Sequence, residues 1–391
     1  MSLLSKTGHL VSLALTALIG GVVIGGVVIG SGCSGGDAPM PTWSQAFDAK
    51  RVGWLLSTWG PSDTDMYAVG GEPDSGLIMH YDGATWSPVG LGLTVPLLNW
   101  VFGFGPNDIT AVGRSGTVIH WDGNNWSIQT VPTAEDLWGV WGASPNDMWA
   151  VGGRGREDGQ ATLLHFNGTA WSTETIPQLQ RAGVNALFKV WGSSAADVYV
   201  VGQRGGVLHY DGNTWMEQLV GASEDLISVW GTGPNLVVAV GGRGSGIVSL
   251  FDGSSWKTES LAPFPGLNGI WLNNSNQAHV VGTVGSLGIL DLKTFSIERS
   301  IVSTDQDFHA VFSPSGKTLT AVGGNLFAVQ APYEGIAFKR TLDLDASNAL
   351  KLTGSDRQGS DGYRAEVPAL NRNFGVKSYS ISTDLGLERS P

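Results

Sequence analysis

The chain has 391 residues, including 57 Gly and 16 Trp, and its 22 basic and 34 acidic residues give a net charge of −12. A hydrophobic content of 42% excludes an acidic disordered chain, and the negative charge argues against a nucleic-acid partner bound through its phosphates. A single Cys excludes an internal disulfide and a Cys-based zinc site within this sequence. Abundant Gly beside abundant Trp predicts a repeat of short strands and tight turns around aromatic anchors.

The first segment, residues 1–32, is typical of a targeting sequence, because it contains an apolar run over residues 10–29 that is long enough to span a bilayer. The small residues before Cys33 resemble a bacterial lipobox, although Gly30 stands where that motif prefers an aliphatic side chain. The resemblance implies lipidation of Cys33, with residues 33–41 as the lipidated Cys and a flexible tether. It implies a membrane-anchored lipoprotein of the bacterial cell envelope, with the outer membrane or cell surface favoured. An uncleaved signal anchor is the alternative.

From residue 55 onward one unit recurs seven times: an aromatic anchor, a Val-Gly pair whose Gly lies 11 residues later, and a closing aromatic, which in four units ends the motif Asp-Gly-x-x-Trp. The anchors are Trp59, Phe102, Trp141, Trp191, Trp230, Trp271 and Phe312. The closing aromatics are Trp86, Trp126, Trp171, Trp215, Trp256, Phe295 and Phe338. Each unit holds four apolar runs, A to D, and its Asp-Gly pair predicts a type I′ hairpin between C and D. The sequence therefore predicts an all-β protein, a β-propeller of seven four-stranded blades over residues 42–338.

The residues at the two ends of the repeat region bear on whether the propeller has seven or eight blades. Trp43 lies 16 residues before Trp59, the spacing at which a D strand precedes the next A strand, so residues 42–44 are expected to complete the last blade. Residues 339–391 are rich in charge and contain no Trp. They are predicted to form a C-terminal extension, and a degenerate eighth blade is the alternative.

The repeat of the first blade is similar to a known family. Ala68-Val69-Gly70-Gly71, followed by Tyr81-Asp82-Gly83 and Trp86, resembles a kelch repeat, and the resemblance extends over roughly residues 43–338. The double Gly is complete in only four units, and the spacing from Tyr to Trp is shorter than in the family. The resemblance implies a propeller that serves as an interaction platform, although kelch-like enzymes exist.

The internal repeats also indicate which face binds a partner. The A–B and C–D connections keep a constant length, whereas all length variation falls in the B–C and D–A connections, which emerge on the same face of a propeller. The largest insertions lie in residues 153–161 and 172–187. Six arginines in these connections predict a basic crescent for carboxylate, phosphate or acidic sugar groups: Arg114, Arg154, Arg156, Arg181, Arg204 and Arg243. Alternatively, these side chains only keep Gly-rich loops soluble.

Four histidines, His80, His120, His165 and His209, occupy one repeat position in four different blades, so they are expected to hydrogen-bond within each blade and not to share a metal ion. No metal, cofactor or catalytic signature is found. The leading hypothesis is a cell-envelope propeller that binds a protein or glycan, without nucleic acid. The alternatives are a polysaccharide-active glycosidase or lyase with its site on the variable loops, and a scaffold subunit of an envelope assembly complex.

Overall fold

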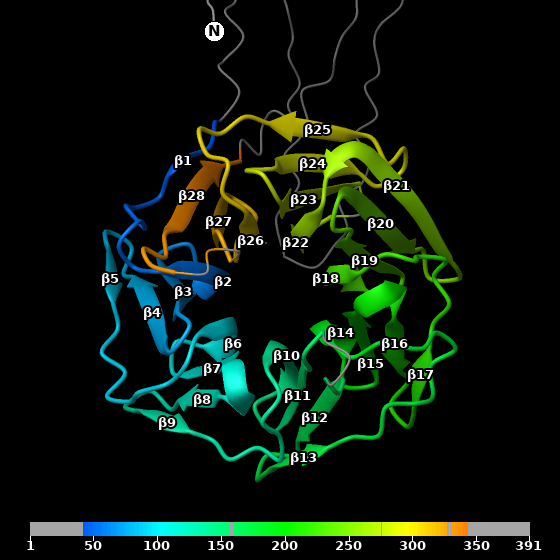
Figure 1. The fold of residues 1–391 in the computed structure, drawn as a ribbon, viewed down its shortest axis with the longest axis horizontal. Coiled ribbons are helices and arrows are strands. Elements are labelled where there is room, and N and C mark those ends of the chain that lie inside the picture. Colours follow the sequence, from blue (N-terminus) through cyan, green and yellow to red (C-terminus); the bar gives the residue numbers. More distant parts are fainter. Residues whose placement is uncertain (1–41, 156–158, 275, 327, 329, 343–391) are drawn as a thin grey trace, which may run out of the picture. The chain divides into compact units, whose positions relative to one another are not determined.

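The computed structural model describes residues 42–342, apart from 156–158, 275, 327 and 329. Within these residues, 28 strands form seven four-stranded antiparallel sheets around a central axis (Figure 1). The predicted seven-bladed β-propeller is therefore confirmed. The first strand of each repeat, A, lies nearest the axis, and D forms the outer edge of the ring.

The blades follow one another in chain order. Blade 1 contains β2 (Trp54–Ser62), β3 (Asp65–Glu72), β4 (Ser75–Tyr81) and β5 (Trp86–Pro88). Blade 2 contains β6 (Leu98–Gly105), β7 (Asp108–Gly113), β8 (Val118–Trp121) and β9 (Trp126–Ile128), with the short 3-10 helix η1 (Arg114–Gly116) between β7 and β8. Blade 3 contains β10 (Leu137–Ser144), β11 (Asp147–Gly152), β12 (Thr162–Phe166) and β13 (Trp171–Thr173).

The second half of the ring repeats this order. Blade 4 contains β14 (Leu187–Ser194), β15 (Asp197–Gly202), β16 (Val207–Tyr210) and β17 (Trp215–Glu217), with η2 (Gln203–Gly205) after β15. Blade 5 contains β18 (Leu226–Gly233), β19 (Leu236–Gly241), β20 (Ser245–Phe251) and β21 (Trp256–Pro265). Blade 6 contains β22 (Leu267–Trp271), β23 (Gln277–Gly282), β24 (Leu287–Asp291) and β25 (Ile297–Ser300).

Blade 7 is completed by the opposite end of the described chain. It contains β26 (Phe308–Phe312), β27 (Thr318–Gly324) and β28 (Gly335–Thr341), and β1 (Ser44–Gln45) pairs antiparallel with β28 as the outer strand. The closure expected from Trp43 is confirmed. As the closing aromatic of its unit, Phe338 is expected after the C–D turn, on strand D, and this is wrong: Phe338 lies on β28, the third strand, where it pairs with Gln45. Since β1 fills the fourth place, seven blades close the ring, and residues 343–391 lie outside the described part.

The C–D connection differs from the predicted type I′ turn. Tyr81 pairs with Trp86, so four residues separate the strands, and only Gly83 among them has a positive φ, of 93°. Asp82 precedes the central pair and its Oδ1 accepts the N–H groups of the two residues after Gly83, at 2.9 and 2.8 Å. These hydrogen bonds keep the pKa of Asp82 below its usual value. Asp82 therefore stabilises the turn, as expected, but in a four-residue connection and not in a two-residue type I′ turn.

Blade 6 departs from the repeat at the same connection. Phe295 lies in the turn with a φ of 57°, and β25 begins two residues later at Ile297. The assignment of Phe295 to strand D is therefore wrong. Its ring still packs against the cluster between blades and lies 4.6 Å from the Lys257 Nζ, so its packing role is retained.

The Trp-Gly pairs of the inner strands explain how neighbouring blades pack. A methyl group placed on Gly103 would lie 2.6 Å from the Trp59 ring, and one on Gly192 would lie 2.5 Å from the Trp141 ring. Trp59, Trp141 and Trp191 each cover the Gly that follows the anchor of the next blade. The side-chain-free position creates the space into which the indole fits.

The four histidines bind within their own blades, as predicted. The Nε2 atoms of His80, His120, His165 and His209 lie 2.8, 3.0, 2.7 and 2.7 Å from the Oδ1 of Asp65, Asp108, Asp147 and Asp197. Each Asp begins strand B and each His lies near the end of strand C, so every pair lies beside the A–B and C–D turns. We call this side of the ring the constant face, and the side with the B–C and D–A loops the variable face.

Candidate functional site: an axial cavity on the variable face

All seven inner strands carry a β-bulge at one and the same place. In β14, for example, the register shifts between Leu187 and Lys189, so Phe188 has no partner on β15. The bulged residues, each three positions before its anchor, are Leu56, Asn99, Trp138, Phe188, Ile227, Asn268 and His309. A bulge reorients its extra side chain. All seven of these side chains line one cavity of about 410 Å³ at the axis.

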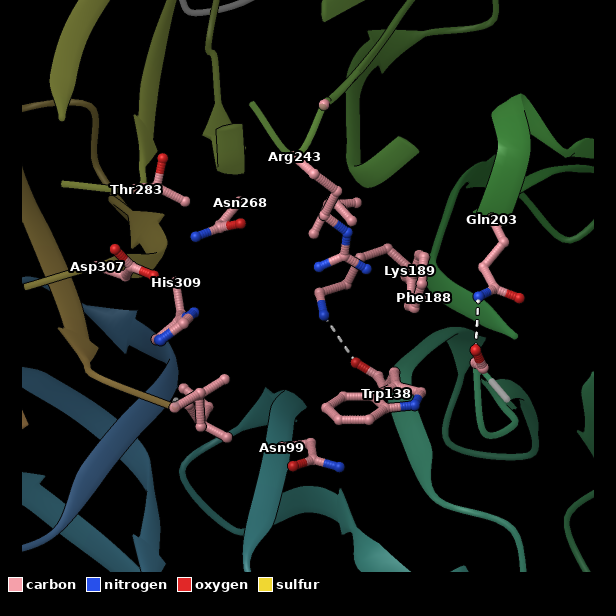
Figure 2. A pocket seen from close by; sticks show the side chains of 15 residues that line it. Asn99, Trp138, Phe188, Lys189, Gln203, Arg243, Asn268, Thr283, Asp307 and His309 are labelled. Carbon is pink, nitrogen blue, oxygen red and sulfur yellow. Dashed lines mark hydrogen bonds between the residues drawn. The ribbon is translucent and has the colours of Figure 1, made fainter. Parts of the chain in front are cut away.

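Loops of the variable face complete the wall of this cavity. Gln203, Arg243, Thr283 and Leu326 come from B–C connections, and Asp307 comes from a D–A connection (Figure 2). The cavity therefore opens on the face that carries the length variation. The prediction of the binding face is consistent with this position, because a concave site is where a propeller can enclose a ligand.

Sequence reasoning pointed to the loops and missed the ring of bulged residues. The signal lies within strand A, whose consensus is Leu-x-x-Val-Trp-Gly: the position after Leu is Leu, Asn, Trp, Phe, Ile, Asn or His in the seven blades. Strand length is constant there while side-chain chemistry changes. When the side chain varies while the backbone geometry stays fixed, that side chain is not required for the structure of the blade and can contact a ligand.

Two of the bulged side chains tie neighbouring inner strands together. Asn99 Nδ2 donates to the Leu137 carbonyl of the next blade at 2.8 Å, and Asn268 Nδ2 donates to the Phe308 carbonyl at 2.9 Å. The Oδ1 of Asn99 is buried and has no partner within the described residues. A buried amide oxygen without a donor is a group that a ligand N–H or a water molecule can satisfy.

The two ring nitrogens in the wall bind the second Gly of a double Gly. Trp138 Nε1 donates to the Gly153 carbonyl at 2.9 Å, and His309 Nε2 donates to the Gly324 carbonyl at 2.8 Å. Burial lowers the pKa of His309. The neutral imidazole is therefore fixed with its proton on Nε2, which leaves Nδ1 as an acceptor.

Lys189 places an amine at the centre of the cavity. Its Nζ donates to the Trp138 carbonyl at 2.8 Å (Figure 2). The same Nζ lies 4.1 Å from the centroid of the Trp100 ring. Burial lowers the pKa of Lys189 to about 7. The amine is therefore poised between its charged and neutral forms at neutral pH.

Arg154 and Arg243 occupy loops of the variable face, and their guanidinium groups contact groups of neighbouring loops. Arg243 Nε and Nη2 both lie 2.9 Å from Asp225 Oδ2, and Arg243 lines the axial cavity. Arg154 Nε lies 3.7 Å from Glu135 Oε2, and its Nη2 donates to the Ala134 carbonyl. Each guanidinium is thus accompanied by a carboxylate, which reduces the positive field of the crescent.

Arg181 and Arg204 come together away from the axis. Arg181 Nη1 donates to the carbonyls of Arg204 and Ala222, which fastens the long D–A loop of blade 3 to blade 4. Arg114 begins η1 in blade 2, and Arg156 lies outside the described residues. A single basic crescent that binds a ligand stays a prediction. Of its described members, only Arg243 reaches the axial cavity.

Three B–C loops share a clamp that also shapes the variable face. Each contains a non-Gly residue with a φ of 55° or 56°, and its N–H donates at 2.9 Å to the Asp that precedes strand A of the next blade. The pairs are Ser115 with Asp136, Arg204 with Asp225, and Val284 with Asp307. Because the left-handed conformation is unfavourable for these residues, the carboxylates hold the loops in place.

No group of three or more His, Cys, Asp or Glu side chains among the described residues is arranged to hold a metal ion. Among the same residues no helix is long and apolar enough to cross a membrane. Cys33 and the predicted targeting segment lie outside them.

Comparison with known proteins supports the fold alone. No protein-family model matches the chain, and no curated protein matches it in sequence. Solved structures do match. YCF48 bound to D1 peptide has a TM-score of 0.57 at 15% identity and covers 78% of this chain and 99% of its own. YCF48 from Cyanidioschyzon merolae has a TM-score of 0.56 at 13% identity, over 77% and 98%. The WD40 repeats of RRP9 have a TM-score of 0.61 at 11% identity, over 78% and 100%. The chain is similar to these propellers in architecture.

Proposed function

We propose that this protein is a binding platform that holds an extended segment of a protein partner across its variable face. The observation that carries the proposal is a continuous hollow surface. A second hollow shares Arg243, Thr283 and Asp307 with the axial cavity and continues outward over blades 5 and 6. An extended peptide fits such a groove because its backbone and alternate side chains contact both walls.

The groove reaches the rim of the ring. A third hollow shares Asp305 and Gln306 with the second and extends along β1 and β28 of blade 7. It is lined by Ile301, which is 91% exposed. An apolar side chain left in water beside a groove is typical of a surface that awaits a partner.

Val284 marks the middle of this path. Its side chain is 58% exposed and its φ is 55°, a conformation that is strained for a β-branched residue. Neither its exposure nor its strain stabilises the propeller. Strained residues of this kind cluster at ligand contacts, and a role in binding accounts for an apolar side chain at this position.

Two similarities support a protein partner over a glycan. A solved propeller of similar architecture is described as YCF48 bound to D1 peptide. The kelch-like pattern of the repeats points in the same direction, since kelch propellers serve mainly as interaction platforms. We further propose that the platform is displayed on the bacterial cell envelope through lipidation at Cys33. Replacement of Cys33 by Ala should release the protein from membranes, and retention would favour a signal anchor.

The test uses peptides selected from a random display library on the purified full-length protein. Val284→Asn keeps the side-chain size, tolerates the left-handed backbone and removes the apolar contact. It should weaken selected peptides at least tenfold. Ile128→Asn is the matched control, because Ile128 is also 58% exposed and lies on the outer strand β9. Selected peptides that bind both variants as they bind the unmodified protein would contradict the proposed groove.

A further inference from the structure

Lys189 breaks the repeat at a position that is otherwise uncharged. It stands two residues before the anchor of blade 4. The corresponding residues of the other blades are Ser57, Trp100, Gly139, Ser228, Gly269 and Ala310. Six small or aromatic side chains show that the propeller does not need a cation at this place. The single Lys is therefore an addition to the repeat and not a part of it.

The amine has no carboxylate partner among the described residues. No carboxylate oxygen of these residues lies within 4.0 Å of its Nζ, and its hydrogen-bond partner is the Trp138 carbonyl. An ammonium group has three N–H donors. A half-buried cation that is supported by one carbonyl and one aromatic face lacks the anion that would normally accompany it.

The surroundings suit an anionic group that is carried on an apolar body. Four of the bulged residues line the cavity with apolar side chains: Leu56, Trp138, Phe188 and Ile227. Polar side chains at the same cavity are those of Asn268, Thr283 and Gln203, and the amide groups of Asn268 and Gln203 each keep a second N–H beyond the one bonded to a backbone carbonyl. The other charged or titratable groups that face the amine across the cavity are Arg243, Asp307 and His309.

We propose that the axial cavity is a carboxylate-binding pocket in which the Lys189 ammonium pairs with the anion and the ring of bulged residues holds the chain that carries it. This inference rests on the proposed function and names its anchoring contact: the carboxylate belongs to the partner segment, as an Asp or Glu side chain or as a free C-terminus. A monoanion is favoured over a phosphate dianion, because Asp307 lies in the same wall. The apolar bulged side chains likewise favour a ligand with a hydrophobic body.

The pH dependence of binding follows from the same amine. Burial lowers the pKa of Lys189 to about 7, so the amine in the empty pocket loses its charge as the pH rises above neutrality. A bound carboxylate favours the charged form and raises this pKa. Affinity for a carboxylate should therefore fall above pH 7, by up to about tenfold per pH unit.

The experiment uses the full-length protein and a small probe that does not depend on any selected peptide. Binding of 3-phenylpropionate is measured by ligand-observed NMR and compared with 3-phenylpropionamide, which has the same shape without charge. The carboxylate should bind at least tenfold more tightly at pH 6.5, and this preference should vanish at pH 9. Equal binding of the acid and the amide would overturn the proposal.

Variants assign the effect to one side chain. Lys189→Met should lower the affinity for 3-phenylpropionate at least tenfold and remove the pH dependence, which separates Lys189 from Arg243, Asp307 and His309. Lys257→Met is the matched control, since Lys257 also lies over an aromatic ring but is on the outer strand β21. Should the Met variant fail to fold, Lys189→Gln retains a donor for the Trp138 carbonyl. Unchanged probe binding in a folded Lys189 variant would overturn the proposal.

Two further probes distinguish the source of the carboxylate. N-acetylphenylalanine presents a C-terminal carboxylate, whereas N-acetylglutamic acid α-amide presents that of a side chain. Tighter binding of either probe that depends on Lys189 supports the pocket and assigns the source; binding of neither contradicts it. Failure of the proposed function is distinguishable from failure of the pocket. Selected peptides that bind Val284→Asn as tightly as the wild type contradict the peptide groove, independently of how the small probes bind.

Discussion

The two faces of the propeller are built from the same seven repeats and differ in what is repeated. On the constant face, His–Asp pairs and Asp-centred turns recur from blade to blade with distances of 2.7 to 3.0 Å. On the variable face, the bulge recurs in every blade while its side chain changes. Repetition of a side chain indicates a role in the blade. A constant backbone with a changing side chain indicates a surface that is free to recognise something else.

The largest expected effect tests whether the repeated Trp-Gly contact supports the scaffold. Gly192→Ala should lower the free energy of unfolding by about 1–3 kcal/mol, because its methyl group would overlap the Trp141 ring. Gly90→Ala is the control, since nothing lies within 4 Å of the added methyl, and it should change stability by less than about 0.5 kcal/mol. Chemical denaturation measures both. Equal effects would mean that the packing between blades is looser than the structure indicates.

The second expected effect concerns the non-repeated amine. The pKa of Lys189 is lowered from 10.5 to about 7, so between these values the unfolded chain binds a proton that the folded protein does not. The free energy of unfolding of the wild-type protein, measured relative to that of Lys189→Met, should therefore rise with pH by at most about 1.4 kcal/mol per pH unit. Unfolding of both proteins at pH 7 and pH 8 measures this difference. A difference that is independent of pH would place the amine in water.

A third substitution separates stability from binding on the constant face. Asp197→Ala removes the acceptor of His209 Nε2 and should cost about 1 kcal/mol of unfolding free energy. Selected peptides should bind this variant as they bind the wild type. Thermal unfolding and peptide titration are measured on the same sample. Weaker peptide binding without loss of stability would show that the constant face takes part in recognition.

The smallest expected effect is an increase in stability, caused by a substitution on the variable face. Val284→Asn relieves a β-branched residue of its left-handed conformation and should raise the free energy of unfolding by about 1 kcal/mol. The same variant is expected to lose affinity for selected peptides. Lower stability would show that the clamp from Asp307 fits valine better than asparagine.

The sequence predicted the fold well because a propeller repeats its signals. The anchor aromatic, the Val-Gly end and the Asp-Gly turn each recur, and even the closing strand was visible from the spacing of Trp43 to Trp59. The errors occurred where the repeat is imperfect. Phe338 matched the closing aromatic of the pattern, but β1 occupies the fourth position of that blade, so Phe338 is on the third strand.

The candidate site was harder to predict for a physical reason. The residue after the first Leu of strand A varies between blades, but a bulge is a feature of strand pairing, so the sequence does not show that Asn99, Phe188 and His309 turn into one cavity. The arginines were visible because their charge is conspicuous, yet local acceptors engage Arg154, Arg181 and Arg243. Lys189 was overlooked because it lies inside a strand that otherwise reads as core.

Hydrogen–deuterium exchange of the full-length protein with and without a selected peptide tests the division between the faces most directly. We expect the peptide to slow exchange in the variable-face loops 242–244, 283–286 and 301–307. Exchange in the constant-face turns 106–107, 145–146 and 195–196 should be unchanged. Protection of those turns with unaltered exchange in the three loops would contradict the account.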